Sequence, residues 1–215
     1  MTNYLINTTS KKRLADTTTP VSIYLRLRDV FPNTILLESS DYHSRSNSVS
    51  YVCAEPVAGI VLQDNVLSTY FPDGRKERKT EFVLTEEIEK FKSSFTPHVV
   101  EDTRYISSGL FGYFTWNAVQ HFEDIKFSAT TPKDQQIPVM QYHIYRYIIA
   151  IDHFKNEVTL FKNTFNGDDT EDLEKIEYII QNKNFPEYTF KTNGEESSNL
   201  SNQDFMDIVE KMKSK

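Results

Sequence analysis

Short apolar runs separated by polar turns fill the middle of the chain. Residues 57–62 and 66–71 are two such runs, joined by residues 63–65, and residues 139–151 and 158–161 are two more on either side of a polar bend. Runs of this length that are rich in Val, Ile, Tyr and Phe, with turn residues between them, are typical of β-hairpins. The pattern therefore predicts at least two antiparallel hairpins.

Helical patterns are fewer. Pro20, preceded by Thr19 as a cap, opens an apolar stripe that ends at Phe31, and further amphipathic stretches cover residues 85–95 and 173–182. The strands follow one another in hairpins and do not alternate strictly with helices. The sequence therefore predicts an α+β fold, a mostly antiparallel β-sheet packed with a few helices.

Composition narrows the class of protein. The 215 residues carry 24 Lys and Arg against 31 Asp and Glu, and this net charge of -7 argues against binding to nucleic acid or to an anionic membrane. The chain lacks a run of about 18 apolar residues, and it begins without the charged and apolar regions of a signal peptide. We therefore expect a cytoplasmic protein that does not enter the membrane.

A single cysteine, Cys53, excludes a disulfide framework and a zinc site built on several thiolates. It lies in the strand-like run 49–53, which we expect the pair Glu55-Pro56 to end. A small buried side chain is the ordinary role of one cysteine in a strand. We expect neither a metal site nor a reactive thiol here.

Polar segments divide the chain into three parts. Residues 1–19 form a polar, threonine-rich N-terminal arm, and residues 20–192 hold the expected sheet and helices. Residues 193–215 comprise a linker and the start of an amphipathic helix capped by Ser201. The chain stops within this helix, without a glycine cap, so we expect residues 20–192 to be the N-terminal domain of a larger two-domain protein.

The most distinctive chemistry lies in residues 34–41, where the apolar run Ile35-Leu36-Leu37 ends on Glu38, two serines and an aspartate. A carboxylate at the rim of an apolar slot suits the amine of a bound amino acid, since binding pockets are mostly apolar with a few placed polar groups. The same pattern also fits a strand that runs into a polar turn.

A second unusual segment is rich in glycine and aromatic residues. Gly109 and Gly112 are two of only six glycines, and five aromatic side chains lie within residues 111–122. We expect close backbone approach or unusual dihedral angles at both glycines. The segment lacks the third glycine of a dinucleotide fingerprint and the Gly-Lys-Ser/Thr of a P-loop, so core packing is the better interpretation.

Four segments in this order along the chain carry a family resemblance. They are Leu36-Leu37-Glu38-Ser39, Ser50-Tyr51-Val52-Cys53-Ala54-Glu55-Pro56, Gly109 to Asn117 with Glu123 beyond it, and Ser198-Asn199-Leu200-Ser201 with the helix that follows. Together they resemble the chorismate-using enzymes typified by component I of anthranilate synthase. The resemblance covers nearly all of the chain after the first twenty residues.

That resemblance implies a regulatory role for this chain. In such enzymes a C-terminal catalytic domain binds chorismate and Mg²⁺, receives ammonia from a glutamine amidotransferase subunit, and releases pyruvate to give anthranilate. The N-terminal domain binds L-tryptophan as a feedback inhibitor. We therefore expect no catalytic residue, metal ligand or cofactor within these residues, and expect Mg²⁺ in the catalytic domain.

Carried onto this sequence, the implied tryptophan-binding positions lie at the end of the first strand and at the start of the second: Leu37, Glu38, Ser39, Ser48, Val49 and Ser50. Two alternatives stay open. One is the equivalent domain of component I of aminodeoxychorismate synthase, a folate-pathway enzyme. The other is a stand-alone β-rich module that binds a small ligand and whose resemblance to the family is accidental.

Overall fold

The structure of the protein is a computed structural model. It describes residues 2–15, 18–38, 48–98, 104–127, 136–167, 173–182, 189, 191–194 and 197–214. The elements in chain order are β1 (Tyr4–Leu14), α1 (Pro20–Arg28), β2 (Ile35–Leu37), β3 (Val49–Gln63), β4 (Val66–Tyr70), β5 (Lys76–Lys79), α2 (Leu84–Ser93), β6 (Phe95–Pro97), β7 (Phe111–Phe114), the 3₁₀ helix η2 (Trp116–His121), β8 (Met140–Asp152), β9 (Glu157–Phe165), α3 (Leu173–Gln181) and α4 (Asn202–Lys213).

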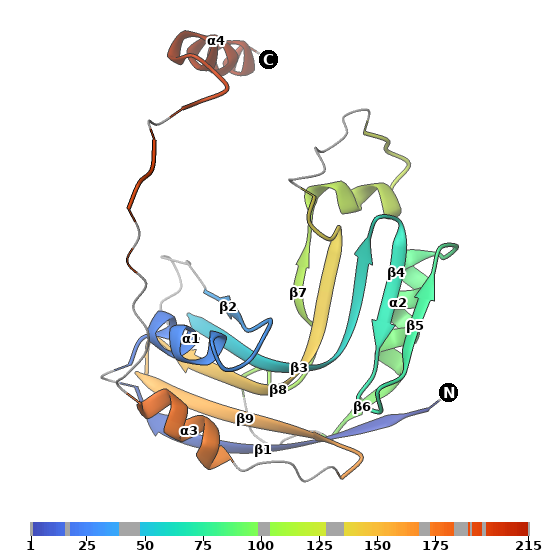
Figure 1. The fold of residues 1–215 in the computed structure, drawn as a ribbon, viewed down its shortest axis with the longest axis vertical. Coiled ribbons are helices and arrows are strands. Elements are labelled where there is room, and N and C mark those ends of the chain that lie inside the picture. Colours follow the sequence, from blue (N-terminus) through green and yellow to red (C-terminus); the bar gives the residue numbers. More distant parts are fainter. Residues whose placement is uncertain are drawn as a thin grey trace. The chain divides into compact units, whose positions relative to one another are not determined.

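Nine strands of the described residues form one sheet in the order β5-β4-β3-β8-β9-β1-β6, with β2 paired to β3 and β7 paired to β8 (Figure 1). β1 and β6 run parallel, and the other described pairings are antiparallel. Helices pack on this sheet, so the expected α+β fold with a mostly antiparallel sheet is confirmed.

Both predicted hairpins are present. β3 and β4 pair from Gly59 opposite Tyr70 to Gln63 opposite Val66, and Asp64 and Asn65 turn the chain with φ angles of 51° and 58°. Positive φ at both central residues is the signature of the hairpin turn whose twist matches that of the strands. β8 and β9 form the second hairpin, through the bend that follows Asp152.

The expectation that Glu55-Pro56 ends a strand is wrong. β3 continues through both residues, and its register against β8 shifts between Pro56 and Ala58. Glu55 takes a φ of 59°, and its carboxylate accepts a hydrogen bond from Arg146 Nε at 3.0 Å. An extra residue inserted in one strand is a β-bulge, which bends the strand without ending it.

Two large hydrophobic clusters pack along the bent sheet. α1 and α3 lie on one face of the part nearest β9 and bury Ile23, Leu27 and Ile176 against β3, β8 and β9. α2 buries Leu84 and Phe91 against the other end of β3. The bulge lets one continuous strand contribute to both clusters.

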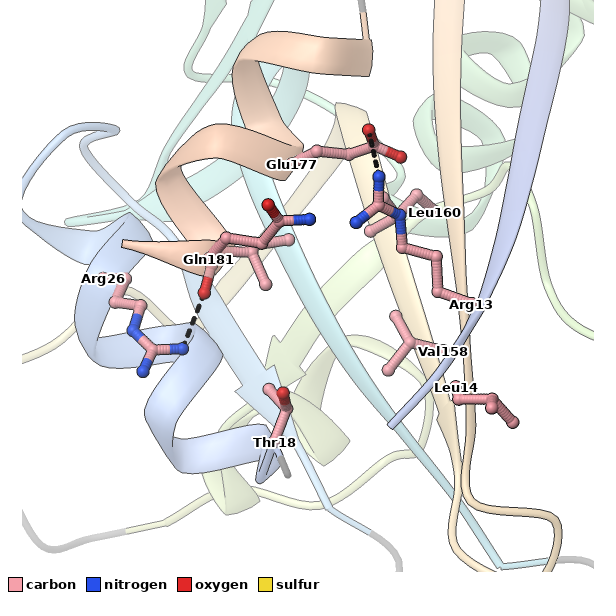
Figure 2. Close-up of a pocket in the computed structure, with 9 residues that line it drawn as sticks. Arg13, Leu14, Thr18, Arg26, Val158, Leu160, Glu177 and Gln181 are labelled. Carbon is pink, nitrogen blue, oxygen red and sulfur yellow. Dashed lines mark hydrogen bonds and ion pairs between the residues drawn. The ribbon is translucent and has the colours of Figure 1, made fainter. Parts of the chain in front are cut away.

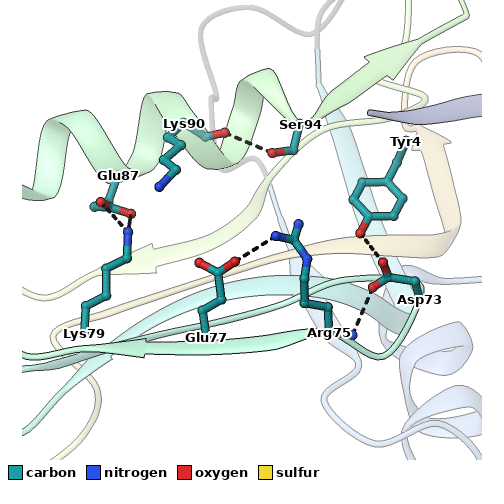
Figure 3. Close-up of polar contacts among 8 residues, drawn as sticks. All are labelled: Tyr4, Asp73, Arg75, Glu77, Lys79, Glu87, Lys90 and Ser94. Atoms are coloured by element: carbon teal, nitrogen blue, oxygen red, sulfur yellow. Dashed lines mark hydrogen bonds and ion pairs between the residues drawn. The ribbon is translucent and has the colours of Figure 1, made fainter. Parts of the chain in front are cut away.

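The polar segment 1–19 contains a strand that its sequence did not reveal. β1 lies between β9 and β6 and buries Tyr4 and Ile6, while much of the rest of the strand is exposed. Tyr4 donates a hydrogen bond from its hydroxyl to Asp73 Oδ2 at 2.7 Å, in the turn before β5 (Figure 3). This bond lowers the pKa of Asp73, whose other oxygen accepts from the Arg75 amide at 2.9 Å.

Residues Pro186–Lys215 form a compact unit separate from Met1–Phe185. Within it, Ser201 caps α4: its hydroxyl accepts from the Asp204 amide at 3.1 Å, and Asp204 Oδ2 accepts from the Ser201 amide at 3.2 Å. This reciprocal capping box stabilises the first turn of the helix. The predicted cap is confirmed.

Candidate functional site

The predicted binding segment lies at the end of β2, where β2 pairs with the start of β3. Leu37 is directly opposite Tyr51, and Ile35 is opposite Cys53. Because directly paired residues project to the same face of a sheet, Leu37 and Tyr51 share one face with Ile35. Ile35, Val49 and Tyr51 pack there on a core formed around Cys53 and Phe111.

Glu38 follows β2 at once and is exposed, and Leu37 keeps 38% of its surface exposed. Ser39 lies outside the described residues. An exposed carboxylate thus follows an accessible leucine in the chain at the end of β2, where Leu37 is paired with the aromatic residue Tyr51.

A buried polar cluster lies beside this surface. Asp152, only 1% exposed, is paired with Val49 in the sheet and accepts a hydrogen bond from the Tyr105 hydroxyl at 2.8 Å. Its Oδ2 also forms an ion pair with Arg104, and its Oδ1 accepts from the amides of Phe154 and Lys155 at 3.0 and 2.9 Å. The carboxylate closes the β8–β9 turn and fixes Tyr105 against the sheet.

Tyr51 joins the same region to the segment that precedes β7. Its hydroxyl accepts a hydrogen bond from the Ile106 amide at 3.1 Å, and its ring packs on Phe111 with centroids 6.0 Å apart. Burial raises the pKa of the Tyr51 hydroxyl, which therefore stays neutral at physiological pH.

Ser50 points away from this surface. Its side chain is fully buried, and its Oγ lies 2.7 Å from His153 Nε2. Successive side chains in a strand alternate between the two faces, so Ser50 lies on the face opposite to Val49 and Tyr51. Ser48 contributes its carbonyl oxygen, which accepts from the His153 amide at 3.1 Å.

The structure thus brings together only some of the predicted positions. Leu37 and Val49 share a face with Tyr51, whereas the Ser50 hydroxyl is bound to His153. Tyr51, Arg104 and Tyr105 were not predicted as site residues from the sequence. The feature of the sequence that could have pointed to this region is the adjacent pair Asp152-His153 at the hairpin bend. Their side chains form hydrogen bonds on different sides of the sheet.

The expected close approach at Gly112 is confirmed. A Cβ atom at this position would lie 1.9 Å from the Gln141 carbonyl oxygen of β8, so only glycine lets β7 pair there. Gly109 has a positive φ of 151°. Gly112 thus serves the packing of β7 on β8.

In the described part of the chain, no three His, Cys, Asp or Glu side chains lie together in a way that could hold a metal ion. Burial raises the pKa of the Cys53 thiol, which keeps it protonated. No helix among the described residues combines the length and apolar character needed to cross a bilayer.

A family model described as a chorismate binding enzyme matches residues 32–215. This chain belongs to the chorismate binding enzyme family. The resemblance to this family is therefore not accidental. Family membership rests on nearly the whole chain, from the residues just before β2 onward.

Similar members of the family are named anthranilate synthase component 1. The protein from Mycolicibacterium smegmatis is 27% identical over 165 residues, which are 75% of this chain and 30% of that protein. The protein from Mycobacterium tuberculosis H37Rv is 24% identical over 169 residues, which are 76% of this chain and 32% of that protein. The chain thus spans about a third of the length of these relatives.

Among solved structures, anthranilate synthase component I from Streptococcus pneumoniae TIGR4 matches with 18% sequence identity and a TM-score of 0.41. The match covers 79% of this chain and 35% of that chain.

Proposed function

We propose that this chain is the regulatory, tryptophan-binding part of an anthranilate synthase component I. The pairing of Leu37 with Tyr51 carries the proposal, because it puts an accessible leucine and an aromatic ring on one face at the strand end that Glu38 follows in the chain. A ligand with an apolar ring and an ammonium group matches this surface. The names of the family relatives favour anthranilate synthase over the folate-pathway alternative.

Each group has a defined part in binding. Leu37, Val49 and Tyr51 offer apolar and aromatic contact for the indole, and aromatic pairs of this kind contribute about 0.5–1.5 kcal/mol beyond their buried area. Glu38 offsets the charge of the ammonium through a charge-assisted hydrogen bond. Ser39 is assigned to the polar end of the ligand. Family resemblance also implies Ser48 and Ser50 as binding positions, but the Ser50 hydroxyl is held by His153 on the other face of the sheet.

For the whole protein we propose the reaction that the family resemblance implies: conversion of chorismate to anthranilate, with Mg²⁺ and with ammonia from a glutamine amidotransferase subunit. The catalytic domain of the same protein is then the partner that transmits tryptophan binding to turnover. The residues of this chain hold the inhibitor and take no chemical step in the reaction.

The test is tryptophan inhibition of the full-length enzyme that contains Glu38→Ala. Loss of a charged hydrogen bond costs about 1.5–3 kcal/mol, so the inhibitor concentration at half inhibition should rise roughly ten- to hundredfold while uninhibited turnover is retained. Glu81→Ala removes an exposed carboxylate elsewhere and serves as the matched control. An unchanged inhibition curve for Glu38→Ala would contradict the proposed site.

A further inference from the structure

A cavity of about 560 Å³ lies between α1, α3 and the strands β1 and β9 (Figure 2). Its volume falls within the range of about 300–1,000 Å³ that is usual for small-molecule sites. The cavity is on the face of the sheet that α1 and α3 cover, two strands beyond β3, whereas Leu37, Val49 and Tyr51 belong to the opposite face. It is therefore separate from the proposed tryptophan site.

Glu177 gives this cavity a buried acceptor. The residue is 6% exposed, and its Oε2 accepts from Arg13 Nη2 at 2.6 Å and from Lys11 Nζ at 2.9 Å. Its Oε1 is also buried, and none of the described residues forms a hydrogen bond with it. A buried acceptor without a partner is costly, so a donor that reaches Oε1 gains more than it would at an exposed carboxylate.

The charge around Glu177 is positive. Two cations, Lys11 and Arg13, meet a single carboxylate, which leaves one positive charge uncompensated within this group. A guanidinium presents five N–H donors, and the bond to Glu177 engages only one end of Arg13. The remaining donors of Arg13 suit a carboxylate, which guanidinium binds in a bidentate manner.

The floor of the cavity is apolar. Val158 and Leu160 of β9 and Ile180 of α3 line it with aliphatic side chains, and Figure 2 shows the side chains of Val158 and Leu160. A hydrocarbon group bound here moves from water onto an apolar surface. This transfer is favourable by about 25 cal/mol per Å² of apolar surface buried. The site thus joins an anion-binding group, a buried acceptor and an apolar floor.

We propose that this cavity binds a small carboxylic acid that has an apolar body and an α-hydroxyl or α-amino group. The carboxylate contacts Arg13, the hydroxyl or amine donates to Glu177 Oε1, and the apolar body rests on Val158 and Leu160. The chemistry of recognition is the same for a hydroxy acid and an amino acid, and the experiment distinguishes them.

The probes are L-3-phenyllactate, L-phenylalanine, 3-phenylpropanoate, which lacks the donor, and 2-phenylethylamine, which lacks the carboxylate. Titration followed by the amide NMR signals of the unmodified chain should shift residues of α3 and β9 with one or both of the first two probes. The stronger binder of these two identifies the donor. The two truncated probes should bind at least about tenfold more weakly, since each lacks one charged hydrogen bond.

Glu177→Gln should weaken binding of the preferred probe about tenfold or more. Glu174→Gln makes the same change of charge at an exposed position of α3 and should leave binding unaltered. The amide spectrum of each variant checks that the fold is kept. If Glu177→Gln does not fold, the amide shifts measured on the unmodified chain still test the proposal.

Three results would overturn the proposal. They are no shift in α3 or β9 with either complete probe at about 10 mM, equal binding of 3-phenylpropanoate, or shifts confined to residues around Leu37 and Tyr51. The last result would place the ligand in the tryptophan site and leave the proposed function intact.

Discussion

Ser50 and His153, 103 residues apart in the chain, are joined by a contact of 2.7 Å between Oγ and Nε2. Val49, the neighbour of Ser50, faces the other side of the sheet together with Tyr51. The hydroxyl of Ser50 therefore connects β3 to the β8–β9 turn, and the side chain of Val49 remains on the proposed binding face.

Ser50→Ala should lower the free energy of unfolding by about 0.5–1.5 kcal/mol, because it removes one buried hydrogen bond and leaves His153 without this partner. Urea unfolding measures the change. In the full-length enzyme the same substitution should leave tryptophan inhibition nearly unaltered. A large loss of inhibition at normal stability would show that the Ser50 hydroxyl contacts the ligand, as family resemblance predicts.

The chain by itself should bind L-tryptophan weakly. By family resemblance the catalytic domain supplies part of the pocket wall, and Leu37 and Glu38 are exposed in this structure. Leaving about 100 Å² of indole uncovered forfeits about 2–3 kcal/mol at ~25 cal/mol per Å², which turns micromolar binding into roughly sub-millimolar binding. Tight stoichiometric binding in a calorimeter would show that the pocket is complete within residues 1–215.

Gly112→Ala should destabilise the pairing of β7 with β8. The new Cβ would lie 1.9 Å from the Gln141 carbonyl oxygen, and the backbone atoms on both sides can separate only by losing strand hydrogen bonds. Overpacking of this kind costs about 1–3 kcal/mol or more. Thermal unfolding checks the effect against Lys76→Ala, at an exposed position of strand β5. Equal melting temperatures for the two variants would contradict the close approach.

Because of His143, the free energy of unfolding should be lower in mild acid than at neutral pH. Its ring is buried, with Nδ1 2.9 Å from the Tyr70 hydroxyl and Nε2 2.9 Å from Gln141 Nε2, and burial lowers its pKa in the folded protein. The unfolded chain, with a histidine pKa of about 6.5, then binds the proton more readily. The contribution of His143 to stability is therefore present above pH ~6.5 and declines as the pH falls toward its folded pKa.

Urea unfolding at several pH values between neutral and mildly acidic conditions tests this dependence. His143→Gln should show a shallower loss of stability than the native protein over this range. His98→Gln, at an exposed position, should keep the native slope. The same slope in all three proteins would mean that His143 does not titrate differently in the folded and unfolded states.

Local sequence was sufficient to predict several elements of the fold. Thr19 caps α1 as expected, with its hydroxyl accepting from the Ser22 amide at 3.1 Å, and the turn at Asp64 and Asn65 forms the predicted hairpin. Both depend on residues within a few positions of one another. Family membership was likewise predictable, because short motifs in a fixed order carry it.

Contacts between distant segments decided the elements that the sequence did not predict. The sequence of β1 alone is mostly polar and does not predict a strand. β1 is held in the sheet because Tyr4 and Ile6 are buried, and because Glu177, far along the chain, forms ion pairs with Lys11 and Arg13. β3 continues past Glu55 because its pairing with β8 accommodates a bulge.

The candidate site divides in the same way. The sequence determined that a carboxylate follows an apolar strand at Glu38, which is a local property of the chain. Only the tertiary structure decided which side chains share its face, since the register of β2 on β3 aligns Leu37 with Tyr51 and directs Ser50 to the other side. A shift of register by one residue would exchange the two faces, and register is fixed by contacts between strands that the linear pattern does not contain.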